Sequence, residues 1–142
     1  MALSVRLSRF TPRVGGGSAF FVRRIMSRLQ SHELIKRSGE RIVIYVADDG
    51  RSACPVCGIL LSGEWAWDYY WAADEHGNKI GEPHAGASFN ICPCCNTQFG
   101  FDDYVERGSQ TDRWAALRRK WLERAPRNLE VVEQLQNIGV KI

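Results

Sequence analysis

The sequence has no apolar stretch that approaches the length of a membrane span. A transmembrane helix needs about 20 consecutive apolar residues, whereas the longest candidate here is Ala19–Val22. That stretch is also too short for the hydrophobic region of a secretory signal. Because both signals are missing, we expect a cytoplasmic protein with no membrane partner. In that reducing compartment cysteines act as thiols or metal ligands before they form disulfides.

Acidic residues are missing from the first 32 positions, which carry six arginines. The chain has 19 basic and 16 acidic residues, so segment 33–142 keeps 13 basic against all 16 acidic ones, a net charge of −3. A domain of that charge lacks the broad basic surface of a nucleic-acid-binding protein. We therefore favour a protein partner over nucleic acid.

The arginine-rich leader is interrupted by Pro12 and by the glycines of segment 15–17, which break any long helix. It fits three interpretations: a mitochondrial presequence over residues 1–25, a disordered basic tail, or an over-extended start whose true initiator is Met26. We assign residues 1–27 to a disordered or leader segment. A genuine presequence would change the expected localisation from cytoplasmic to mitochondrial.

The chain as a whole has the composition of an ordinary globular protein, because 44% of its residues are hydrophobic and 25% are charged. This length and composition allow one domain plus a tail. We assign residues 28–126 to the domain and residues 127–142 to a C-terminal helix. The sequence does not indicate an oligomeric state.

Three segments in the first half of the domain have recognisable local patterns. Residues 29–36 are compatible with a short helix, and the β-branched segment 41–47 predicts a buried strand. Segment 64–73 begins with an alternating pattern that places Trp65 and Trp67 on one face, so it predicts a strand. A returning strand is predicted over residues 79–84, where Pro83 interrupts it.

Two helices are predicted in the C-terminal part. Ser109 or Thr111 can cap a helix over residues 112–124, which Pro126 ends. The apolar residues of this helix recur on one side; they are Trp114, Leu117, Trp121 and Leu122. Asn128 can cap a second helix that stops near Gly139. The second helix is predicted over residues 129–136, with Leu129, Val132 and Leu135 facing inward.

One short cysteine motif occurs twice, as Cys54-Pro55-Val56-Cys57-Gly58 and as Cys92-Pro93-Cys94-Cys95-Asn96. Two cysteines separated by two residues can curl around one ion, with both sulfurs about 2.3 Å from it. The proline restrains the backbone, and glycine and asparagine adopt positive φ at least cost after the second cysteine. We therefore predict one structural Zn²⁺ ion, held by Cys54, Cys57, Cys92 and Cys95. A hairpin inserted between the two motifs accounts for their wide spacing.

Cys94 occupies the variable position of the second motif, so we expect it to point away from the metal. Its simplest interpretation is a small buried hydrophobic residue. A spare reactive thiol and a replacement ligand are the alternatives.

Other interpretations of the four cysteines are less well supported. Two disulfides conflict with a reducing compartment. A redox C-P-x-C motif begins a helix after a strand, and neither motif here is followed by a convincing helix. Four thiolates leave no open position for a catalytic water. His76 and His84 could each replace a ligand only by breaking a motif, so we interpret both as surface residues.

Three other groups could bind ligands but have simpler explanations. An aromatic cluster could stack on bases, yet aromatics more often form the core of a small domain; the cluster is Trp65, Trp67, Tyr69, Tyr70 and Trp71. Asp102, Asp103 and Glu106 could hold a cation, although we expect their carboxylates to be solvated at the surface. The basic residues of segment 113–124 are expected to face solvent.

Segment 87–103 (ASFNICPCCNTQFGFDD), together with the upstream CPVCG, resembles the bacterial cysteine-rich CPCC family. Segment 114–124 (WAALRRKWLER) resembles the tryptophan-bearing helix that follows in related sequences. The resemblance implies the same four ligands, Cys54, Cys57, Cys92 and Cys95. This sequence departs from the family pattern in its long aromatic insert and in Asn96, where glycine is common. Because the family is largely uncharacterised, the resemblance implies a fold and a metal but no activity.

These observations predict an α+β protein. Its small zinc-ribbon-like β core would contain two knuckles and a β-hairpin insert, with the C-terminal helices packed beside it. A non-enzymatic interaction module of immunity or adaptor type is the expected function, because the sequence has no recognisable acid–base pair. A nucleic-acid-binding zinc ribbon is the alternative, and a thiol-redox protein that uses the C-P-x-C motifs is the second alternative.

Deleting residues 1–25 is expected to change the free energy of unfolding by no more than about 1 kcal/mol, because this glycine-broken segment has no periodic face to bury. Urea unfolding of the full and shortened chains measures the difference. A large loss of stability would mean that Phe20 and Phe21 dock in the core.

Overall fold

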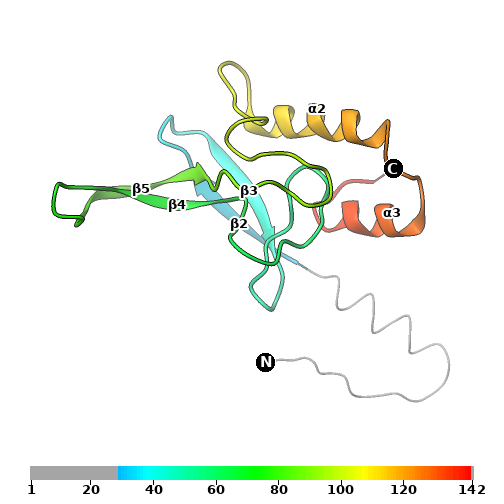
Figure 1. The fold of residues 1–142 in the computed structure, drawn as a ribbon, viewed down its shortest axis with the longest axis horizontal. Coiled ribbons are helices and arrows are strands. Elements are labelled where there is room, and N and C mark those ends of the chain that lie inside the picture. Colours follow the sequence, from blue (N-terminus) through cyan, green and yellow to red (C-terminus); the bar gives the residue numbers. More distant parts are fainter. Residues whose placement is uncertain (1–28, 142) are drawn as a thin grey trace, which may run out of the picture.

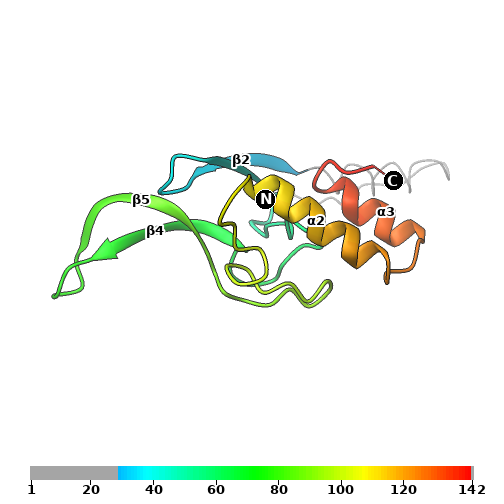
Figure 2. The ribbon, with the colours of Figure 1, turned by 90° about the horizontal axis from the view of Figure 1, so that it is seen from above.

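The computed structural model describes residues 29–141, so the leader assigned to residues 1–27 and the choice between Met1 and Met26 lie outside the described part. The fold is α+β, as predicted, with two antiparallel sheets of two strands each and two helices. A β-hairpin projects at one end of the molecule, and both helices lie toward the other (Figures 1 and 2). None of the described helices combines the length and apolar character needed to cross a membrane.

The first sheet pairs β2 (Gln30–Ile35) with β3 (Arg41–Val46). The helix predicted over residues 29–36 is wrong, because this segment forms β2. A helix this short has little stability of its own, whereas the strand places Leu34 opposite Ile42 in the core. The strand predicted at β3 is confirmed, and its buried residues alternate as Ile42, Ile44 and Val46.

The second sheet pairs β4 (Trp67–Ala73) with β5 (Lys79–Ala87) in an antiparallel hairpin. β5 extends beyond the predicted return over residues 79–84, and Pro83 does not end it. The register shifts between Tyr70 and Ala72, so Pro83 lies where the ladder is already irregular, a position that tolerates a residue without an N–H.

The first helix, α2 (Gln110–Leu122), begins at the predicted cap Ser109, whose hydroxyl accepts the Asp112 N–H at 3.0 Å. Its two tryptophans, Trp114 and Trp121, are buried as predicted. A residue far away in the sequence also caps the N-terminus of the helix, because the Glu40 carboxylate accepts the Gln110 N–H at 2.7 Å.

Glu40 lies in the turn between β2 and β3. Burial alone raises the pKa of its carboxyl, but the Gln110 N–H and the Lys36 ammonium, 3.0 Å away, bring that pKa below its ordinary value. A lowered pKa means that the interaction stabilises the fold at neutral pH and is lost as the pH falls through the folded-state pKa.

The second helix, α3 (Leu129–Gln136), has the predicted bounds and the predicted cap, since the Asn128 side chain accepts the Val131 N–H at 3.0 Å. Its buried face differs from the prediction. Val131 and Leu135 are buried, whereas Leu129 is 67% exposed. Leu129 is the first residue of the helix, before the stripe that meets the core begins.

A fully buried carboxylate, Asp103, joins the hairpin to α2. One of its oxygens accepts the indole N–H of Trp67 at 2.9 Å and that of Trp114 at 2.8 Å, and the other accepts the Gly100 N–H. The two indole rings meet edge to face, with their centroids 6.1 Å apart. The solvated position expected for Asp103 is therefore wrong. A buried carboxylate is tolerated because hydrogen bonds replace its water.

Replacing Trp121 with alanine is expected to cost about 3–5 kcal/mol of unfolding free energy, the range for truncating a buried aromatic residue. Arg119→Ala, an exposed change two positions earlier on α2, should stay within about 0.5 kcal/mol. Urea unfolding of both variants checks the pair. If the tryptophan variant melted like the wild type, its side chain would not belong to the core.

Candidate metal centre

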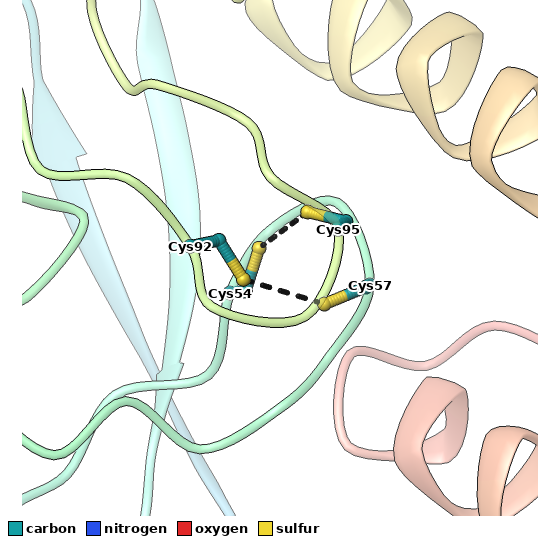
Figure 3. A group of neighbouring side chains, drawn as sticks. All are labelled: Cys54, Cys57, Cys92 and Cys95. Atoms are coloured by element: carbon teal, nitrogen blue, oxygen red, sulfur yellow. Dashed lines mark hydrogen bonds between the residues drawn. The ribbon is translucent and has the colours of Figure 1, made fainter.

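Four of the five cysteines meet at one point (Figure 3). Their Sγ atoms all lie within 4.8 Å of one another, and the residues are 0–6% exposed. These are the four predicted ligands, Cys54, Cys57, Cys92 and Cys95. The structure therefore brings together the set of donors that the two sequence motifs indicated.

Two of the sulfur separations match those of a tetrahedral site, and the others are compatible with one. Cys54 Sγ lies 3.7 Å from Cys95 Sγ, and Cys57 Sγ lies 3.7 Å from Cys92 Sγ. Four sulfurs placed tetrahedrally about 2.3 Å from one ion would be about 3.8 Å apart. A disulfide needs about 2.05 Å, and all five cysteines are free. The group can hold one metal ion between the two motifs.

Each motif forms a tight knuckle whose backbone faces the first sulfur. The Val56 N–H donates to Cys54 Sγ, and the Cys94 N–H donates to Cys92 Sγ, both at 3.4 Å. Such N–H groups stabilise negative charge on a thiolate. The two knuckles thus repeat one geometry, as their shared sequence predicts.

The residue after each second cysteine has positive φ, as predicted: +87° at Gly58 and +65° at Asn96. Gly58 meets a second constraint that the motif did not reveal. A Cβ at this position would lie 2.0 Å from the Gln134 carbonyl oxygen of α3. The first knuckle therefore requires glycine both for its turn and for the close approach of the helix.

Helix α3 is attached to the first knuckle by side-chain amides. Gln134 donates to the Cys57 carbonyl at 3.0 Å and lies 3.3 Å from Cys94 Sγ, while Asn137 donates to the Gly58 carbonyl at 2.9 Å. Cys94 is half-buried and lies outside the four-sulfur group. Gln134 thereby spans both knuckles.

Helix α2 contacts the same knuckle through Arg118. Its guanidinium donates to the carbonyls of Pro55 and Val56, both at 2.8 Å. The expectation that this arginine faces solvent is wrong, although its spacing carried the signal: it is four residues after Trp114 and three before Trp121, on the buried side of the helix. Burial lowers the pKa of Arg118, and the nearby Cys54 and Cys57 partly oppose that shift.

Crowding controls the ionisation of the sulfurs. Burial raises the pKa of Cys54, and contacts with Cys54 and the other two sulfurs raise that of Cys57. Contacts with Cys54 first, and then with Cys57, lower the pKa of Cys92 and that of Cys95. Four buried thiolates this close together repel one another, so a cation is needed before all four can be ionised.

The other candidate ligands do not gather into a site. Among residues 29–141, the four cysteines are the one group of three or more potential ligands that lie together. His76 is exposed at the hairpin tip, and His84 pairs with Tyr70 along β5. Asp102 accepts the Gln98 N–H at 2.7 Å, and Asp103 is committed to the indoles.

Comparison of the chain with protein-family models, curated proteins and solved structures found no match. The resemblance to the CPCC family thus stays an expectation from the sequence, and the site is interpreted from its geometry.

Cys95→Ser is expected to abolish tight metal binding, because it removes one corner of the tetrahedron. Cys94→Ser, one position away, is the matched control and should keep nearly the full metal content. Elemental analysis of both purified proteins measures the difference. If the two variants behaved in the opposite way, the ligand set would be wrong.

Proposed function

We propose that this protein is a non-enzymatic, protein-binding module whose fold is held by one structural zinc ion. The observation that carries the proposal is the buried tetrahedral sulfur group. Four protein donors complete the coordination of zinc, so the ion has no position left for a substrate or an activated water.

Zinc fits the donor set on chemical grounds. Tetrahedral sites made only of thiolates take zinc or iron, and zinc brings no redox chemistry of its own. Metal binding would supply folding free energy, which this chain needs because each sheet has two strands and isolated two-stranded hairpins are marginal in water. The expected metal content is about one zinc per chain.

An interaction role is supported by what surrounds the site. Both helices are used to hold the first knuckle, through Arg118 and Gln134. The hairpin, in contrast, projects from the body (Figure 2). Its aromatic residues Tyr70 and Trp71 are exposed. Membership of the CPCC family and an immunity or adaptor role are part of the same proposal.

The thiol-redox alternative is disfavoured by the sulfur contacts. A redox pair works by joining the two cysteines of one C-x-x-C motif, whereas one metal ion bound by this group would occupy all four sulfurs. The nucleic-acid alternative rests on the basic exposed side of α2, and salt-dependent binding to DNA or RNA would favour it.

Thiol modification of the zinc-loaded protein tests the proposal against the redox alternative. With zinc bound, iodoacetamide should modify Cys94 alone, because ligation protects the other four sulfurs. After chelation all five should react and the fold should be lost. Mass spectrometry and circular dichroism measure both effects. Catalytic reduction of a disulfide substrate by the zinc-loaded protein, or an intact fold in excess chelator, would contradict the proposal.

A further inference from the structure

The hairpin of residues 67–87, here called the arm, exposes large apolar side chains at the end of the molecule away from the helices. Tyr70 and Trp71 are each 42% exposed, and Ile80 is 47% exposed. The Trp71 indole is held in place by the Lys79 ammonium, 4.1 Å from the ring centroid. Ile80 pairs with Ala72, the residue after Trp71, so the exposed side chains lie near one another on the two strands. Apolar patches rimmed by polar residues mark interaction surfaces.

The arm is also acidic. Segment 67–87 contains four carboxylates and a single lysine; the carboxylates are Asp68, Asp74, Glu75 and Glu82. This charge repels nucleic acid and repels a second arm. A partner for the arm must therefore offer an apolar surface with a basic rim.

The same chain carries such a surface beside its second knuckle. A groove of about 260 Å³ lies between this knuckle and α2, and we call it the basic groove. Leu117 contributes apolar surface above the buried Trp121, and Lys120 and Arg124 contribute cations. Asp102 also lines the groove, with its carboxylate turned to the Gln98 N–H. Within the described residues neither cation has an ion-pair partner. A second hollow of about 400 Å³ shares Trp121 and Arg124 with the groove.

The charge of this region is opposite to that of the arm. Segment 110–127 contains six basic residues and two acidic ones. Arg113 lines the groove and is oriented by two hydrogen bonds to the Asp102 carbonyl, at 3.1 and 2.8 Å. An apolar centre with a charged rim is the usual composition of a protein interface.

We propose that the arm of one copy docks into the basic groove of a second copy, so that the chain assembles head to tail. The proposal rests on the function proposed above, since it names the partner of the module. The arm points away from α2 in both views, so it does not reach the groove of its own chain (Figures 1 and 2). Because two different surfaces meet, a pair of copies leaves one arm and one groove free. Further copies can therefore add to form a ring or a filament.

Charge reversal tests the contact on the full-length, zinc-loaded protein. Sedimentation should show masses above the 16.1 kDa monomer at high protein concentration and a return to the monomer in high salt. The arm variant Glu75→Lys/Glu82→Lys and the groove variant Lys120→Glu/Arg124→Glu should each weaken self-association by about tenfold or more. Mixing the two variants should restore it, because every arm then faces a groove of opposite charge.

Two controls separate this contact from general attraction between charges. Arg51→Glu/Arg107→Glu makes the same change in net charge as the groove variant, at exposed residues outside the arm and the groove, and should assemble like the wild type. Trp71→Ser keeps the charges of the arm and should still weaken assembly.

The inference is overturned if the wild type stays monomeric at all concentrations. It is also overturned if the groove variant assembles normally. The arm would then bind a different surface, such as the arginine-rich residues 1–28 or another protein. Zinc content and circular dichroism are measured on every sample. A monomer with intact fold and zinc refutes only the self-assembly, whereas a wild type that folds without zinc refutes the proposed module.

Discussion

The mutual repulsion of four buried sulfurs is the constraint on which the rest of this structure depends. Two pairs with sulfurs 3.7 Å apart are 35 and 41 residues apart in the chain, and they lie where water does not reach. Without a cation the four thiolates cannot all exist, and the two knuckles would then be joined through neighbours such as Gln134, which contacts Cys57 and Cys94. The N–H groups of Val56 and Cys94, aimed at the first sulfur of each knuckle, are arranged for negative charge. The surrounding elements are then placed by their contacts with the knuckles.

Helix α2 links this centre to the second buried polar group. Its Arg118 holds the carbonyls of the first knuckle, and one turn earlier its Trp114 donates to the Asp103 carboxylate, which also binds Trp67 at the base of the hairpin. A shift of the helix would therefore leave unsatisfied donors or acceptors at both places. Unsatisfied buried polar groups are costly, so the helix has one favourable position. The orientation of the hairpin relative to the cysteine centre follows from that position.

The sequence predicted what local chemistry determines, and missed what only tertiary contacts determine. The four cysteines, the positive φ of Gly58 and Asn96, and the helix caps Ser109 and Asn128 follow from spacing and residue type, and the structure contains all of them. Strand β2 was missed because its conformation depends on β3.

The burial of Asp103 was missed because its partners, Trp67 and Trp114, lie 36 and 11 residues away. The position of Arg118 could be predicted only in part. Helical periodicity placed it on the buried side, but a charged residue there is usually interpreted as solvated, and its carbonyl partners belong to a loop 62 residues away.

The projecting hairpin is the part of the molecule that the metal centre needs least. It lies in the loop that the two knuckles close. The entropy cost of closing a loop rises only slowly with its length, by about 0.6 kcal/mol for each doubling. Lengthening the loop to include β4 and β5 therefore costs little, provided that the base of the insert is fixed, and Trp67 fixes it through Asp103. Beyond that anchor, exposed residues such as Trp71 do not contribute to the core. The insert can therefore carry an acidic, aromatic surface without disturbing the four-cysteine group, and for that reason we place one of the two proposed contact surfaces there, while the other lies where α2 faces the second knuckle.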